Sequence, residues 1–177
     1  PQSVEHLINA RTRAILGVHL AGWPCDMDAM KKLVSGRNIA LVEDCAQAHG
    51  ASLNGVPVGS LSDAAAWSFC QDKIMTTAGE GGAVTTSNEE IWSKIWSLKD
   101  HGKSYDAVYN REHQPGFRWL HESIGSNWRM LEIQGAIGRI QLSLMPQWHE
   151  ARARNAQQYY SAWNQLEALR IPVPPKN

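Results

Sequence analysis

The sequence has few cysteines, no excess of charge of one sign and no long apolar run. Its three cysteines, Cys25, Cys45 and Cys70, form no Cys-x-x-Cys pair, which argues against a zinc knuckle or a disulfide framework and fits a reducing cytoplasm. Lys plus Arg and Asp plus Glu both number 17, so we expect no basic surface that would attract a nucleic acid. No stretch of about 18 apolar residues occurs, so we expect no membrane span. The seven histidines include no His-Glu-x-x-His pattern, and we expect no metal site.

The first half of the sequence alternates apolar runs with polar segments. With 177 residues, of which 43% are hydrophobic, the chain is long enough for one sizeable core. Apolar runs predict strands at residues 14–20 and 39–43, and Asp26 is placed to cap a helix between them that ends near Gly36. Strand, helix and strand at this spacing predict a parallel pair of strands, and therefore an α/β fold.

Turn and capping signals predict the next elements. Apolar residues predict strands at 64–69 and 82–86, and Asn54-Gly55 predicts a turn before them. Ser87 and Glu90 form the pattern of a capping box, so we expect a helix to begin at that point.

The last third of the sequence combines a long irregular segment with helical patterns. Residues 102–127 are polar and aromatic, and loops of this length are usually functional or mobile. Apolar residues from Ile133 to Leu144 recur at helical spacing, and Pro146 is expected to separate this helix from a longer one. An extended linker is then predicted by three prolines: Pro172, Pro174 and Pro175.

Lys73 lies between a predicted buried strand and a glycine-rich segment, and Asp44 directly follows another predicted strand. In open α/β sheets, ligands bind beyond the carboxyl ends of the strands, so we expect both side chains at that edge. A lysine amine in such a place forms Schiff bases and moves protons. The motifs around these two residues are Glu43-Asp44-Cys45-Ala46-Gln47, Ser68-Phe69 before Lys73, Gly79-Glu80-Gly81-Gly82, His101-Gly102 and Asn127-Trp128-Arg129-Met130.

In order and spacing, these motifs resemble the DegT/DnrJ/EryC1/StrS family of pyridoxal-phosphate-dependent sugar aminotransferases. The resemblance implies a three-layer αβα fold with a mostly parallel sheet, part of the large domain of a fold-type-I pyridoxal-phosphate transferase. It also implies that residues 1–145 are a partial cofactor-binding large domain and that residues 146–177 are a long helix and linker toward a small C-terminal domain. Because family members are longer, we expect this chain to be a central fragment that is inactive alone.

The resemblance implies a role for each of five residues. Lys73 would form a Schiff base with pyridoxal 5′-phosphate and move the substrate proton, and Asp44 would pair with the pyridine nitrogen of the cofactor. Ser68 would hydrogen-bond the phosphate, and Gln47 would lie against the cofactor ring or the substrate. Asn127 would reach the phosphate of the neighbouring subunit, which makes the protein a homodimer.

Each of these roles has a structural alternative in the residues themselves. Asp44 could cap a turn, Ser68 could bond backbone at a strand end, and Gln47 could be solvated. Asn127 could satisfy loop backbone. His19 and His49 could touch the cofactor or substrate, or be satisfied core histidines.

The overall resemblance implies an aminotransferase that acts on a nucleotide-linked keto-sugar, with an amino acid such as glutamate as donor. Two alternatives stay open: a pyridoxal-phosphate-dependent sugar dehydratase, and a non-catalytic scaffold fragment. Lys73 favours amino transfer, because histidine replaces this lysine in the family's dehydratases. Trp128 and the segment Cys70-Gln71-Asp72 depart from the family pattern, so they leave the sugar unidentified.

Overall fold

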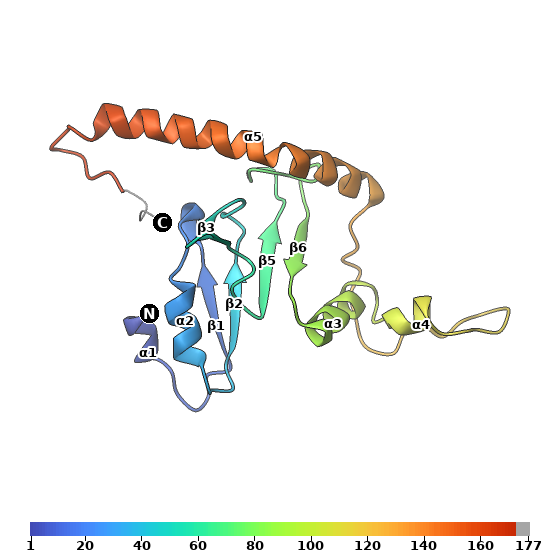
Figure 1. Ribbon diagram of the computed structural model, residues 1–177. Helices are drawn as coiled ribbons and strands as arrows, with labels where there is room; N and C mark the ends of the chain where they lie inside the picture. The colour runs from blue at the N-terminus through green and yellow to red at the C-terminus, as the bar shows by residue number, and fades with distance from the viewer. Residues whose placement is uncertain (173–177) are drawn as a thin grey trace.

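The computed structural model describes residues 1–172, which form a four-stranded sheet with helices against one face and along one edge (Figure 1). The helices are α1 (Gln2–Glu5), α2 (Met27–Val34), α3 (Glu89–Lys99), α4 (Tyr105–Tyr109) and α5 (Glu132–Trp163). The strands are β1 (Ala14–Val18), β2 (Ala40–Asp44), β3 (Ser52–Leu53), β4 (Val56–Pro57), β5 (Ala64–Ser68) and β6 (Gly82–Thr85).

The sheet has the order β1-β2-β5-β6 and is mostly parallel. Strand β2 pairs in parallel with both β1 and β5, whereas β6 runs antiparallel to β5. The predicted α/β class with a mostly parallel sheet is therefore confirmed. The carboxyl ends of the three parallel strands meet at one edge of the sheet, and α5 crosses that edge (Figure 1).

Alternate residues of the strands face the core. Ile15 and Leu41 point from β1 and β2 toward Met27 and Met30 of α2, and together with Leu61 they form a buried cluster. On the opposite face of the sheet, a row of apolar side chains stays exposed in the described residues: Leu16, Val18 and Val84. Residues 1–172 thus supply the sheet and the layer of helices on one of its faces.

The structure confirms two local predictions, the cap at Asp26 and the turn at Asn54-Gly55. The Asp26 carboxylate accepts a hydrogen bond from the Ala29 N–H at 2.9 Å and caps α2. Asn54 and Gly55 form the turn between β3 and β4, with φ of 51° and 75°. Positive φ at both central residues is the geometry that two-residue hairpin turns require.

The capping box predicted at Ser87 and Glu90 is wrong by one residue. Asn88 is the N-cap of α3, and its Oδ1 accepts a hydrogen bond from the Ile91 N–H at 3.0 Å. The Thr86 hydroxyl accepts a hydrogen bond from the Asn88 N–H, which holds the cap in place. Asparagine is as good an N-cap as serine, so the backbone position decides between them.

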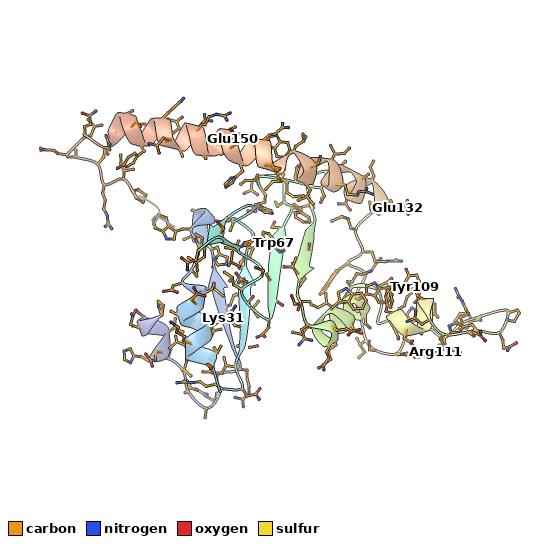
Figure 2. All side chains as sticks on the ribbon, viewed as in Figure 1. Lys31, Trp67, Tyr109, Arg111, Glu132 and Glu150 are labelled. Atoms are coloured by element: carbon orange, nitrogen blue, oxygen red, sulfur yellow. The ribbon has the colours of Figure 1, made fainter. Side chains whose placement is uncertain are left out.

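The predicted break at Pro146 is also wrong, because α5 continues through this proline. A proline inside a helix removes one hydrogen bond and costs about 3 kcal/mol. Contacts with the rest of the protein on both sides of Pro146 offset this cost. Before it, Gln141 bonds the loop after β5 and Met145 is buried; after it, the His149 ring lies against Gly50. Glu132 and Glu150 mark the course of this helix in Figure 2.

The segment predicted as irregular, residues 102–127, contains the short helix α4. An isolated bridge between Asp100 and Asn127 ties it to the end of α3, and a second bridge, between Lys103 and His121, joins two parts of the segment itself. Its middle part extends away from the sheet (Figure 1). Of the prolines that predicted a terminal linker, Pro174 and Pro175 lie outside the described residues.

Candidate functional site

A pocket of about 270 Å³ lies at the edge of the sheet where the parallel strands end. The residues that line it come from the loops after β1, β2 and β5. They are Ala21, Ala46, Gln47, His49, Asp72, Lys73 and Ile74. Two of the five residues predicted from the family resemblance, Gln47 and Lys73, therefore lie in one pocket.

Lys73 is largely covered, with 18% of its side chain exposed. Its Nζ lies 3.2 Å from Oδ1 of Asp72, whose side chain is 68% exposed. The Lys73 ammonium holds the pKa of the Asp72 carboxyl below its usual value. The lysine is thus in the wall of the pocket, while its ionic partner faces solvent.

The loop that carries Lys73 is fastened to α5. The side-chain oxygen of Gln141 accepts a hydrogen bond from the Thr76 N–H at 2.7 Å. Gln134 donates to the carbonyl oxygen of Glu80 at 2.8 Å, and Thr77 donates to the same oxygen. These three bonds fix the loop after Lys73 and so restrict where the amine can reach.

Asp44 ends β2 beside the pocket, but it does not line it. Its Oδ1 accepts a hydrogen bond from the Ala46 N–H at 2.9 Å, so the carboxylate does cap the turn that leads into the pocket. Gln47 is not merely solvated, since its Oε1 accepts a hydrogen bond from the Ala21 N–H at 2.7 Å. This bond joins the loop after β2 to the loop after β1.

Ser68 ends β5, and its hydroxyl accepts a hydrogen bond from the Cys70 N–H at 3.2 Å. Asp44 pairs with Ala66 in the sheet, two residues before Ser68, so Asp44 and Ser68 project from the same face. Asn127 is exposed beside Asp100 and does not line the pocket. The structure therefore gathers four of the predicted residues at one edge of the sheet and leaves Asn127 apart.

His19 and Glu43 form a buried network behind the pocket. The Nδ1 atom of His19 accepts a hydrogen bond from the Cys25 N–H, so Nε2 carries the proton that it donates to Glu43 at 3.0 Å. Three more donors reach the same carboxylate: the N–H groups of Gly59 and Leu61 and the hydroxyl of Ser62. His19 is therefore a satisfied core histidine.

Ligand atoms of His19, Glu43 and Cys45 lie within 4.8 Å of one another, a grouping that a metal ion could use. Both ring nitrogens of His19 and both carboxylate oxygens of Glu43 already have hydrogen-bond partners. Burial raises the pKa of the Cys45 thiol to about 12, so this sulfur stays protonated. We therefore assign the cluster a structural role.

His49 differs from His19, because its buried ring has no hydrogen-bond partner in the described part of the chain. The side chain is wedged between the rings of Trp67 and Phe69, at centroid distances of 5.5 and 6.0 Å. Burial lowers the pKa of His49, the main chain of Ser68 opposes this shift, and the charge of Lys73 adds to it. The imidazole is therefore neutral and still has its donor and acceptor to satisfy.

The comparisons with known proteins agree with this arrangement. The profile of the DegT/DnrJ/EryC1/StrS aminotransferase family matches residues 1–177. The chain belongs to this family. A transaminase of Streptomyces venezuelae named for dTDP-3-amino-3,4,6-trideoxy-alpha-D-glucose is 37% identical over 98% of this chain.

Solved structures of DegT/DnrJ/EryC1/StrS relatives confirm the fold. An aminotransferase from Psychrobacter cryohalolentis is 56% identical over 95% of the chain, with a TM-score of 0.92. The E. coli GDP-4-keto-6-deoxy-D-mannose-3-dehydratase with bound hydrated pyridoxal phosphate is 28% identical over 98% of the chain, with a TM-score of 0.81. The chain spans 42% of the transaminase, 42% of the aminotransferase and 46% of the dehydratase.

Three features of this family member were not predicted from the sequence. The ion pair of Lys73 with the neighbouring Asp72 depends on side-chain conformation. The unsatisfied ring of His49 and the bonds that surround Glu43 depend on contacts between segments that are distant in the sequence. For His49, the sequence offered one signal, its position five residues after Asp44 in a motif shared with the family. No helix of residues 1–172 is both long and apolar enough to cross a membrane.

Proposed function

We propose that the protein containing this chain is a pyridoxal-phosphate-dependent aminotransferase that transfers an amino group from an amino acid to a nucleotide-linked keto-sugar. The observation that supports it is the Lys73 amine in the pocket wall beside Gln47, next to the strand ends that carry Asp44 and Ser68. The substrate class comes from the dTDP-linked sugar for which the Streptomyces relative is named.

The residues at this edge fit pyridoxal 5′-phosphate in chemical type. The Lys73 amine would suit the cofactor aldehyde, the Asp44 carboxylate its ring nitrogen and the Ser68 hydroxyl its phosphate. The Gln47 amide would suit the ring or the substrate. The unpartnered buried ring of His49 also indicates a pocket whose polar groups are not fully satisfied by the described residues. When bound, the cofactor supplies an electron sink for the carbon that carries the transferred nitrogen.

Each of these residues has its own task in the proposed reaction. Lys73 holds the cofactor through its amine and, when that amine is free, carries the proton between substrate and cofactor carbons. Asp44 keeps the ring nitrogen protonated, because an adjacent carboxylate favours the positive charge. Ser68 donates to the phosphate, and Gln47 lies against the ring or the substrate.

Asn127 is assigned to the phosphate site of a second copy of the protein. Its exposure, and its position outside its own pocket, support this assignment. This assignment makes the protein a homodimer, and its three cysteines without a Cys-x-x-Cys pair support a location in the reducing cytoplasm. Residues 1–145 would belong to the large domain and residues 146–177 would lead to the small one, which places the boundary inside α5.

Product analysis tests this function in the protein expressed from its whole gene. With pyridoxal 5′-phosphate, glutamate and a dTDP-linked keto-sugar, we expect an amino sugar and 2-oxoglutarate in equal amounts. The Lys73→Ala variant should lose this turnover by many orders of magnitude while it keeps its fold, as judged by circular dichroism. A deoxygenated sugar with release of ammonia would instead assign the protein to the dehydratases, and turnover by the variant would exclude Lys73 from the chemistry.

A further inference from the structure

Two polar side chains, those of Asp72 and His49, line the same pocket as the Lys73 amine. Asp72 holds the amine now, at 3.2 Å, and lies at the exposed rim of the pocket. His49 is on the inner side, with only 5% of the residue exposed. Asp72 is part of the segment in which this chain departs from the family pattern, so its ion pair with Lys73 is a feature of this sequence.

The unpartnered ring of His49 has an energetic cost. A buried polar group without a hydrogen bond costs about 1–3 kcal/mol, so such groups in folded proteins usually have a partner in some state of the molecule. Neither nitrogen of His49 has a partner at hydrogen-bond geometry in the described residues, and the one polar group that acts on the ring from nearby main chain, at Ser68, leaves at least one nitrogen without a partner. In a neutral imidazole, one ring nitrogen carries no proton and can only accept a hydrogen bond, so it needs a donor nearby.

Lys73 is the donor that can fill this place. It lines the same pocket as His49, and it lies near enough for its charge to act on the ring. The Gln47 amide also lies in the pocket wall, but the Ala21 N–H holds it through its oxygen, and it gives His49 no hydrogen bond in the described residues. The bonds to α5 hold the loop after Lys73, so a movement of the amine away from Asp72 would come from rotation of the lysine side chain.

We propose that His49 is a positioning residue for Lys73: its ring accepts a hydrogen bond from the lysine amine and draws it away from Asp72 into the pocket. The inference rests on the proposed function, since it concerns the same amine.

The consequence for the chemistry is direct. Condensation with an aldehyde requires the unprotonated amine, whose nitrogen attacks the carbonyl carbon. The C=N bond forms, the carbonyl oxygen leaves as water, and the proton of the former ammonium passes to solvent. Asp72 holds the amine in an ion pair at the rim, whereas a neutral imidazole can accept a hydrogen bond from the amine inside the pocket. His49 therefore favours the reactive position.

The test uses the protein expressed from its whole gene and pyridoxal 5′-phosphate as the probe. Borohydride quenching at successive times, followed by peptide mass mapping, gives the rate at which the probe becomes attached to Lys73. His49→Phe removes the acceptor and should slow attachment about tenfold, the equivalent of one hydrogen bond of about 1.4 kcal/mol. His49→Gln keeps an acceptor and should stay within about threefold of the unsubstituted protein. His6→Gln, at an exposed histidine away from the pocket, should change nothing.

The deciding variant combines His49→Phe with Asp72→Asn. If His49 acts by competing with Asp72, removal of the carboxylate should restore the rate to within about threefold of the unsubstituted protein. A purely structural role predicts no such rescue, so a double variant as slow as His49→Phe overturns the proposal. An unchanged rate in His49→Phe overturns it as well. If that variant does not fold, His49→Met serves in its place, because it also removes both nitrogens. Failure of the unsubstituted protein to attach the probe at Lys73 would refute the proposed function itself.

Discussion

The Nε2 atom of His19 lies 3.0 Å from the Glu43 carboxylate, and neither side chain is exposed to solvent. The same carboxylate accepts hydrogen bonds from the loop that precedes β5, at Gly59, Leu61 and Ser62. One buried charge thus ties together the end of β1, the end of β2 and the entry to β5. Because Asp44 follows Glu43 directly, this network fixes the strand end that carries it.

Glu43→Gln should destabilise the protein strongly. The amide replaces one acceptor oxygen with a donor group, which then faces N–H donors that have lost their partner. Breaking one side of a buried charged network costs about 3 kcal/mol. Urea unfolding followed by circular dichroism measures the change, with the exposed Glu89→Gln as the control. A loss below about 0.5 kcal/mol would contradict the role of the network.

Stability should also fall on acidification because of Glu43. Burial alone would raise the pKa of this carboxyl, but hydrogen bonds from Gly59, Ser62, His19 and Leu61 outweigh it and hold the pKa below the usual value. Its stabilising contribution is therefore complete above the pKa of glutamate in the unfolded chain, about 4.3, and is lost as the pH falls below that value. Unfolding free energies measured between about pH 6 and pH 3 should show a slope that Glu43→Gln reduces. An equal slope in both proteins would refute the assignment.

Gly102→Ala should be far more damaging than Gly36→Ala. Both glycines have a left-handed backbone, with φ of 76° and 71°. A Cβ at Gly102 would collide with the carbonyl oxygen of Ser123, whereas one at Gly36 would meet nothing within 4 Å. We expect a loss of about 1 kcal/mol at Gly36 and of 3 kcal/mol or more at Gly102, since backbone must move there. Thermal unfolding of the two variants measures both losses of stability. Equal losses would show that the backbone of residues 121–125 can move to admit a Cβ at little cost.

The cysteines should differ in reactivity. Burial, aided by the charges of Glu43 and Asp44, raises the pKa of Cys45 to about 12, and the residue has no exposed surface. At pH 8, iodoacetamide should therefore modify the half-buried Cys70 before Cys45, which should react only after unfolding. Mass mapping of the modified peptides gives the order of reaction. Early labelling of Cys45 would mean that the buried region around Glu43 opens to solvent in the folded protein.

The elements of the fold follow from local sequence signals where those signals are unambiguous. The apolar runs that became β1, β2 and β5, the Asp26 cap and the Asn54-Gly55 turn are short-range patterns, and the structure confirms them. The helix break predicted at Pro146 is wrong because contacts between α5 and distant loops outweigh the cost of a proline inside a helix. The start of α3 moved by one residue because two good capping side chains stand next to each other.

In the candidate site, too, some features could be predicted from the sequence and others could not. Lys73 and Gln47 are identified by motifs, and the structure places them in one pocket. The partners of Glu43 are sixteen or more residues away, after β1 and in the loop before β5, so no local pattern reveals them. The lack of a partner for His49 is equally invisible in the sequence, since it depends on what the rings of Trp67 and Phe69 exclude.

The central claim, that Lys73 carries the chemistry, is tested most directly by the site of covalent attachment. The protein expressed from its whole gene is incubated with pyridoxal 5′-phosphate, reduced with borohydride and digested. The mass of each lysine-containing peptide is then measured by mass spectrometry. We predict that the reduced cofactor is found on the peptide that contains Lys73, in stoichiometric amount, and that Lys73→Ala takes up none. Attachment spread over other lysines, or equal uptake by Lys73→Ala, would contradict the account.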